Sequence, residues 1–261
     1  MDTLAAVLAR CREREGTALD APERTTPYSY GEFAENAWKA GNLLRHYGVR
    51  RGSRVALVVG PKAPESGDTV GRLGAAVDPL LALFGAASLG ATVDVTPTSP
   101  VAARALVAPD AWLDRYEGDP GCSLIAYGGP PDRPEVAHFE RERWSENPAE
   151  PPDTVEPDDP VLRVDDREYT HATVLEAATT LVEEYGLEPG DVVAVDALLT
   201  SAGAVVAGVV APIVAGAIIR PIPAAGTAAG ADAVYTVRED GEIGSSDAGG
   251  GDVLAPSTVI E

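Results

Sequence analysis

Two segments of the sequence resemble each other closely enough to organise the whole chain. Residues 43–58 read LLRHYGVRRGSRVALV, and residues 181–196 read LVEEYGLEPGDVVAVD. In both copies a helical pattern ends at Tyr-Gly, because glycine readily takes the left-handed conformation that terminates a helix. A turn at Gly52 or Gly190 then leads into a hydrophobic strand. The chain therefore contains the same helix-turn-strand unit twice.

Each half continues with a second helix and a second strand. The apolar helical stretch ends in Gly-Ala at Gly90 and again at Gly216. Strands that alternate with helices of this length indicate parallel construction. We predict an α/β fold of two similar α/β subdomains, with mostly parallel sheets flanked by helices. The expected subdomains are residues 1–127 and 161–261, the second ending in a loose tail, and the Pro- and acid-rich residues 128–160 are the expected connector.

The 261-residue chain carries a formal charge of −21, from 41 acidic residues against 20 lysines and arginines. Only Lys39 and Lys62 are lysines, which resembles proteins that work in molar salt. In molar salt the Debye length falls to about 3 Å, so repulsion between surface carboxylates destabilises the fold only slightly. The carboxylates are spread along the chain, so we interpret them as a solvated, halophilic surface rather than as a face for a basic partner. Nucleic acid is not an expected ligand, because phosphate contacts need clustered Lys or Arg.

Cysteine and histidine are too scattered to predict a metal site or a disulfide framework. Cys11 and Cys122 lie far apart, and neither has a second cysteine or a histidine at ligand spacing. Cys11 shares one face of an opening helix with apolar residues, so a buried structural role is expected. Charged residues interrupt that helix, unlike a signal peptide, and a cytoplasmic location is expected.

One uncharged stretch, residues 197–219, is long enough to cross a bilayer. It reads ALLTSAGAVVAGVVAPIVAGAII, is interrupted by Pro212, and lacks aromatic or basic anchors at its ends. We therefore expect a buried helix that runs into a buried strand, and no membrane partner.

Residues 61–78 form an insertion that has no counterpart in the second half. The insertion is rich in Gly, Pro and charge, and its glycines do not follow the G-x-G-x-x-G spacing of dinucleotide-binding turns. We expect a mobile loop here.

The segment TTPYSYGEFAENAWKAGNLLRHYGVRRGSRVALVV, followed by LLALFGAASLGATVDVTP, resembles the opening of the adenylate-forming enzymes. This superfamily of acyl-CoA synthetases and AMP-dependent ligases typically begins with a Tyr-x-Glu-Leu helix and a G-V-x-x-G-D-R-V-A turn and strand. The resemblance covers most of residues 25–60, 79–97 and 161–222. It implies the fold of the N-terminal large domain of these enzymes.

The sequence departs from the family where ATP is held. In the family, a Ser/Thr/Gly-rich loop ending in Pro-Lys-Gly binds the ATP phosphates just before a Thr-His pair. Here only DDREY, residues 165–169, separates the strand VLRV from Thr-His, so we predict a tight hairpin and no phosphate loop. The family's adenine and ribose motifs, Tyr-Gly-x-Thr-Glu and Thr-Gly-Asp, have no match after residue 222. Its C-terminal domain with a catalytic lysine has no place before Glu261.

The resemblance leaves few candidate site residues. Thr170 and His171 match the family's Thr-His pair, and Thr200 follows the strand where the family lines its acyl pocket, so these three are the candidate cofactor-binding residues. Asp165 and Asp166 are the candidate metal ligands, although two neighbouring aspartates without a third ligand are usually solvated. We expect no catalytic residue, no bound metal and no cofactor.

Two hypotheses for the function follow. In the first, the chain is a truncated, degenerate relative of the adenylate-forming ligases, a pseudoenzyme that binds a protein partner or a small acyl or nucleotide ligand. In the second, it is an AMP-dependent acyl-CoA synthetase or ligase whose nucleotide site is unrecognised or completed by a partner chain.

Overall fold

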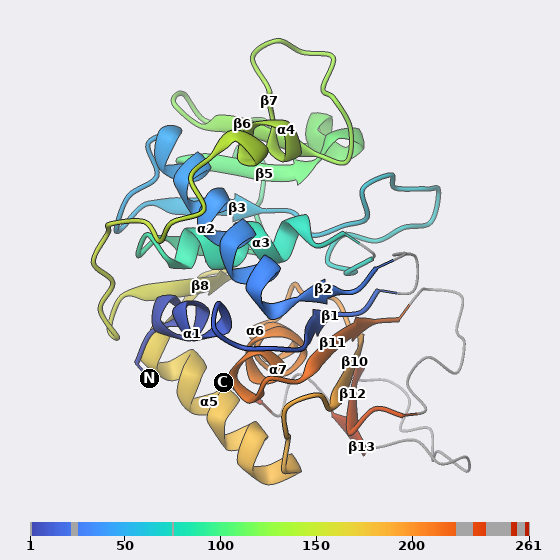
Figure 1. The fold of residues 1–261 in the computed structure, drawn as a ribbon. Helices are drawn as coiled ribbons and strands as arrows, with labels where there is room; N and C mark the ends of the chain where they lie inside the picture. The colour runs from blue at the N-terminus through green and yellow to red at the C-terminus, as the bar shows by residue number, and fades with distance from the viewer. Residues whose placement is uncertain are drawn as a thin grey trace.

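The computed structural model describes residues 2–21, 26–74, 76–222, 232–238, 252–254 and 259–260. Two sheets and their flanking helices make up the fold (Figure 1). The first sheet has seven strands in the order β7-β6-β5-β3-β4-β8-β9. Its strands are β3 (Arg54–Leu57), β4 (Thr92–Asp94), β5 (Ala105–Pro109), β6 (Ser123–Tyr127), β7 (Ala137–His138), β8 (Pro160–Val164) and β9 (Arg167–Thr170).

The second sheet has six strands in the order β13-β12-β10-β11-β1-β2. Its strands are β1 (Thr17–Leu19), β2 (Tyr28–Ser29), β10 (Val192–Asp196), β11 (Ile218–Pro221), β12 (Tyr235–Arg238) and β13 (Asp252–Leu254). In each sheet all neighbouring strands are parallel except one terminal hairpin, β8–β9 in the first sheet and β1–β2 in the second. The predicted α/β class with mostly parallel sheets is confirmed.

Helices connect and cover the strands. They are α1 (Leu4–Cys11), α2 (Tyr30–His46), the 3₁₀ helix η1 (Asp110–Arg115), α3 (Asp78–Ala87), α4 (Phe139–Ser145), α5 (His171–Tyr185), α6 (Ala202–Val205), the π-helical η2 (Val206–Val210) and α7 (Ala211–Ala215). Local sequence explains their ends. A reciprocal capping box of Ser29 and Glu32 begins α2, and Gly186, with a left-handed φ of 59°, ends α5.

The two copies of the repeated segment have the same structure. The first copy runs from α2 into β3, and the second runs from α5 into β10. A hairpin precedes the helix in each half, β1–β2 before α2 and β8–β9 before α5. Each hairpin, however, pairs with the sheet of the other half, through Leu19 with Ile219 and Val93 with Leu162.

The two hairpins cross the expected boundaries between the subdomains. The strand at 17–19 belongs to the second sheet, and β8 and β9, beyond residue 160, belong to the first. The expected connector also contains regular structure, since β7 and α4 lie within residues 128–160, between irregular segments at 128–136 and 146–159. Which sheet each hairpin joins depends on pairing between strands that lie far apart in the sequence, so composition alone does not predict it. The expected tail, residues 241–252, falls almost wholly outside the described residues.

The core is continuous between the two halves, because apolar side chains from both sheets belong to one buried cluster. Two of its helices, α2 and α3, cross at glycines: a Cβ added to Gly85 would lie 2.6 Å from the Gly41 nitrogen. The uncharged stretch 197–219 forms α6, η2, α7 and β11, mostly buried, as expected. No helix among the described residues has both the length and the apolar character needed to span a membrane.

Candidate functional site

The turn between β8 and β9 occupies the place where the resemblance implies a phosphate loop. Val164 pairs directly with Arg167, so Asp165 and Asp166 alone connect the two antiparallel strands. Asp165 has a φ of 52°, in the left-handed region that aspartate tolerates better than most residues. The predicted two-residue hairpin is therefore present.

The backbone of this turn is already hydrogen bonded. The Asp165 N–H donates to the Thr96 hydroxyl over 2.6 Å. The Thr96 N–H in turn donates to the Asp94 carboxylate, at 3.0 Å, at the end of β4. The Asp165 N–H therefore already has a hydrogen-bond acceptor within the protein.

The side chains around the turn form an ionic network of two arginines and three carboxylates. The Arg163 guanidinium lies 2.8 Å from Asp166, 3.6 Å from Asp94 and 3.8 Å from Glu168. Arg54 reaches Glu168 at 3.5 Å. Because both arginines are engaged by carboxylates, this face presents no unneutralised positive charge from either of them.

Of the two candidate metal ligands, Asp166 takes part in this network through its carboxylate, and the Asp165 backbone N–H donates to Thr96. Asp166 is fully exposed and pairs with Arg163. Within the described part of the chain, no three His, Cys, Asp or Glu side chains are placed to share a metal ion. A metal at Asp165 and Asp166 would therefore need ligands that these described side chains do not supply.

Thr170 and His171 lie at the start of α5 and have structural partners. The Thr170 hydroxyl accepts from the Thr173 N–H at 3.1 Å and so caps the helix. His171 is completely buried, and its Nδ1 accepts from the Leu4 N–H at 3.0 Å. Burial lowers the pKa of His171 to about 4. The imidazole is therefore neutral near pH 7 and holds the first turn of α1.

Thr200 lies elsewhere, beyond the carboxyl end of β10. It packs against Gly71 of the 61–78 insertion, where an added Cβ would approach its methyl group to 2.7 Å. The candidates thus fall in two places, Thr170 and His171 beside the β8–β9 hairpin and Thr200 at the second sheet.

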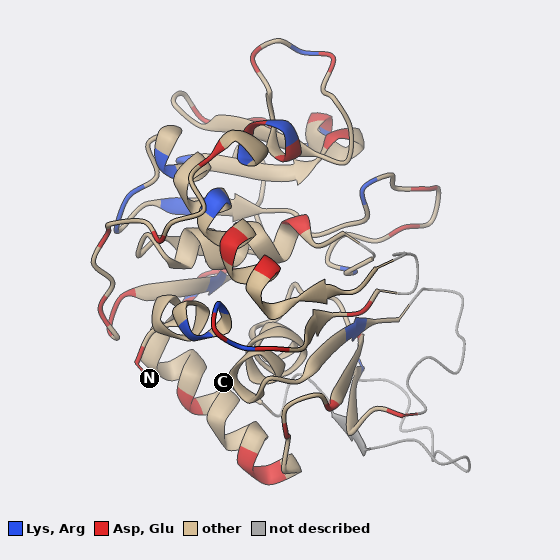
Figure 2. Cartoon of the chain, in the orientation of Figure 1, with Lys and Arg blue, Asp and Glu red and all other residues tan. Residues whose placement is uncertain are grey.

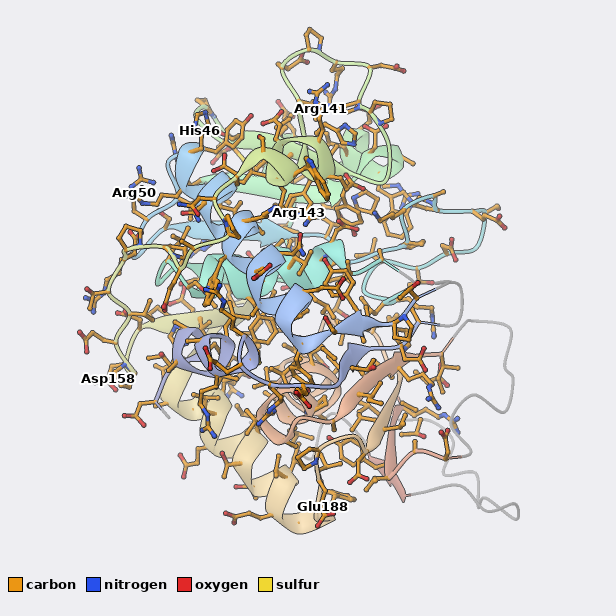
Figure 3. The ribbon with its side chains drawn as sticks, viewed as in Figure 1. His46, Arg50, Arg141, Arg143, Asp158 and Glu188 are labelled. Carbon is orange, nitrogen blue, oxygen red and sulfur yellow. The ribbon has the colours of Figure 1, made fainter. Side chains whose placement is uncertain are left out.

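The sequence analysis did not predict an ionic cluster that is built around the buried carboxylate of Asp78. The Lys62 ammonium lies 2.9 Å from Asp78 and 3.1 Å from Glu140, and Asp78 is fully buried. Arg143 extends from α4 toward α2 and α3, contacting Asn36 and approaching Asp78 to 3.6 Å (Figure 3). The cluster ties the insertion to α3 and α4. The sequence offered one indication, since Lys62 is one of only two lysines.

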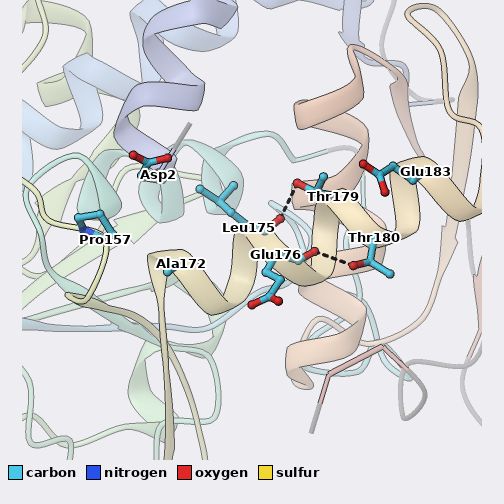
Figure 4. A pocket seen from close by; sticks show the side chains of 8 residues that line it. All are labelled: Asp2, Pro157, Ala172, Leu175, Glu176, Thr179, Thr180 and Glu183. Carbon is cyan, nitrogen blue, oxygen red and sulfur yellow. Dashed lines mark hydrogen bonds between the residues drawn. The ribbon is translucent and has the colours of Figure 1, made fainter.

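A shallow groove runs along α5 (Figure 4). Its hydroxyls are bound within the helix, Thr179 to the Leu175 carbonyl at 2.8 Å and Thr180 to the Glu176 carbonyl at 3.0 Å. The carboxylates of Asp2, Glu176 and Glu183 also line the groove. Negative charge is spread similarly over helices and loops of both halves (Figure 2). The groove is poorly suited to a nucleotide, because its carboxylates repel phosphate.

No protein-family model and no curated protein sequence matches the chain. Solved structures do match. The N-terminal domain of FACL13 from Mycobacterium tuberculosis aligns with a TM-score of 0.67 and 15% identity, covering 91% of this chain and 62% of that one. The benzoate CoA ligase from Burkholderia xenovorans LB400 gives 0.67 and 22%, covering 91% and 50%.

The anthranilate CoA ligase AuaEII, solved with anthranoyl-AMP, gives a TM-score of 0.69 and 16% identity, covering 91% of this chain and 49% of that one. The chain thus spans about half to three fifths of the length of these structures. At such low sequence identity, the similarity to these structures shows the fold alone. The chain has the α/β fold of the N-terminal domain of the adenylate-forming ligases.

Proposed function

We propose that this chain is a non-catalytic binding or regulatory protein built on an adenylate-forming ligase scaffold. The observation that carries the proposal is the two-residue Asp165-Asp166 turn, which stands where the family resemblance implies a loop that holds the ATP phosphates. The β8–β9 hairpin leads directly into α5, and its two-residue turn is too short for a phosphate cradle.

The chemistry of the turn argues in the same direction. A phosphate cradle needs several converging N–H groups and a cation, because phosphate oxygens carry concentrated negative charge. Here the Asp165 N–H is bound by Thr96, and Arg163 is bound by carboxylates. Two aspartates at the turn repel a triphosphate by about 1 kcal/mol per charge pair at 4 Å in water, and by more where water is excluded.

The proposed ligand is a protein partner or a small acyl or nucleotide molecule without a triphosphate. AuaEII holds anthranoyl-AMP, an acyl adenylate, on a similar fold. By analogy, the scaffold of this chain supports binding of an acyl or adenylate group more readily than binding of ATP.

The test combines binding with catalysis in high salt. Thermal shift with ATP and magnesium is expected to show no stabilisation, and pyrophosphate exchange across a panel of short carboxylic acids is expected to stay at background. A matched variant, Asp165→Asn with Asp166→Asn, keeps a two-residue turn and removes both carboxylates. It should also remain silent, since the cradle is still absent. Acid-dependent exchange by the pure wild-type chain would instead establish a ligase with an unrecognised nucleotide site.

A further inference from the structure

Residues 61–74 of the insertion, which we call the strap, bridge the two sheets. The strap follows β3 of the first sheet, where the Gly71 N–H donates to the Val59 carbonyl at 2.8 Å. On its other side, the Leu199 N–H donates to the Gly71 carbonyl at 2.7 Å, and Arg72 forms an antiparallel bridge with Leu198. The sequence suggested a mobile loop, whereas the structure bonds this segment to the loop that follows β10.

An ion pair reinforces this junction. The Arg72 guanidinium donates to one carboxylate oxygen of Asp196 at 3.0 Å, and Arg238 donates to the other at 3.2 Å. The side chains of Arg72 and Asp196 are each only about a quarter exposed. Hydrogen bonds between charged groups in such partly desolvated positions are stronger than neutral ones.

Asp196 lies at the point of the second sheet where the strand order reverses. After β10 the chain adds β11 on one side of it and then β12 on the other, so the strand order reverses between β10 and β12. Asp196 and Arg238 are the last residues of these two strands and pair with each other in register. In open parallel sheets, ligands bind outside the carboxyl ends of the strands at such a reversal point. Arg72 of the strap binds Asp196 at this place.

We propose that the strap is an autoinhibitory closure of the second sheet, and that the Arg72–Asp196 ion pair is its latch. Ligands reach the carboxyl ends of β10 and β12 when the latch opens. This closure is independent of the proposed loss of ATP binding, because it involves the strap and the second sheet rather than the β8–β9 turn.

The burial of the strap shows which part has to move. Residues 65–67 are exposed, whereas Leu73 is 2% exposed and belongs to the main core. The anchor at Leu73 therefore stays in place, and the contacts of Gly71 and Arg72 with the β10 loop are the ones that separate. Without the ion pair, the remaining contacts of the strap with that loop include the Leu199–Gly71 hydrogen bond, the Arg72–Leu198 bridge and the packing of Thr200 against Gly71.

Amide hydrogen exchange of Leu199 measures the closure directly, because its N–H is donated to the strap. In Arg72→Gln we expect the Leu199 amide to exchange about tenfold faster, which corresponds to losing one charge-assisted hydrogen bond. The Gly190 amide, donated to the Gly216 carbonyl at 2.9 Å away from the strap, is the internal reference and should not change. Arg51→Gln, which breaks the exposed ion pair with Asp159, is the matched control variant and should leave Leu199 unchanged.

Binding of the fluorescent sulfonate dye 1-anilinonaphthalene-8-sulfonate supplies a second readout. The dye should bind Arg72→Gln more strongly than the wild type or Arg51→Gln, since it combines an apolar ring with an anion that Arg238 can pair. Unchanged exchange at Leu199 in Arg72→Gln, or dye binding equal in all three proteins, would overturn the latch. If Arg72→Gln also exposes Gly190, a second variant, Arg72→Met, keeps the apolar stem and removes the charge. Faster exchange confined to Leu199 in Arg72→Met supports the latch, and wild-type exchange at Leu199 rejects it.

Discussion

Gly52 and Gly190 occupy equivalent positions in the two halves of the chain. The Gly52 N–H donates to the Gly90 carbonyl, and the Gly190 N–H donates to the Gly216 carbonyl, each at 2.9 Å. The φ angles are 76° and 92°, in the left-handed region. Both turns therefore join a strand to the end of the following helix in the same way, which is the physical basis of the sequence repeat.

Alanine at either position should destabilise the fold by a similar amount. An added Cβ has no neighbour within 4 Å at Gly52 or Gly190, so the cost is backbone strain alone, about 1 kcal/mol each. Urea unfolding of Gly52→Ala and Gly190→Ala measures it. Gly129→Ala is the control, since Gly129 also has free space but no left-handed φ, and it should be near neutral. Unequal costs at the two turns would argue against their equivalence.

The crossing of α2 and α3 should be far less tolerant. An alanine Cβ at position 85 would lie 2.6 Å from the Gly41 nitrogen and 2.8 Å from the Ala37 carbonyl oxygen, both backbone atoms. We expect Gly85→Ala to cost about 2 kcal/mol or more, because the helices must separate. Gly31→Ala in α2 is the matched control: its nearest atom is 3.6 Å away, so better helix propensity should make it neutral or stabilising. A mild effect at Gly85 would show that the helices do not cross this closely.

His171 should make stability depend on pH. Its pKa is lowered to about 4, so between about pH 6.5 and 4 the unfolded chain binds a proton that the native state does not. The free energy of unfolding therefore declines as pH falls through this window, by up to about 3 kcal/mol from this group; the loss is absent above about pH 6.5 and complete below about pH 4.

Urea unfolding at several pH values tests this, with His171→Asn as the comparison. Asparagine can accept the Leu4 N–H without titrating, so the variant should lose less stability than the wild type on acidification. The carboxylates titrate in both proteins and cancel in the difference. Equal losses of stability would mean that His171 is not held neutral.

The sequence repeat and the resemblance predicted the fold class, the helix-turn-strand units and the two-residue hairpin, because local signals determine these features. Tyr-Gly ends the repeated helices, and Asp165-Asp166 suits a tight turn. The exchange of β1–β2 and β8–β9 between the sheets was missed, since it depends on pairs such as Leu19 with Ile219, about 200 residues apart.

The same reason hides the contacts of the strap. Arg72 and Asp196 are 124 residues apart, and neither stands in a motif. At the candidate site, the role of Thr170 as a helix cap and the burial of His171 follow from packing that a linear pattern does not encode.

Salt should stabilise this protein strongly if its surface is of the halophilic type. The formal charge of −21 is screened over about 10 Å in 0.1 M salt but over only about 3 Å in molar salt. We expect the melting temperature to fall markedly when KCl is lowered from about 2 M to about 0.1 M. Equal melting temperatures would remove the halophilic interpretation.

The central claim is that the β8–β9 turn cannot hold the phosphates of ATP. Removing even one donor that stabilises a transition state typically lowers a rate about 100- to 1,000-fold, and here a turn of two aspartates stands where the resemblance implies a whole loop of donors. Calorimetric titration of the pure chain with magnesium ATP in molar KCl tests the claim most directly. The account predicts no saturable heat, for the wild type and for the variant with Asn at positions 165 and 166 alike. Saturable binding of ATP by the wild type that Thr170→Ala or Asp165→Asn abolishes would contradict it.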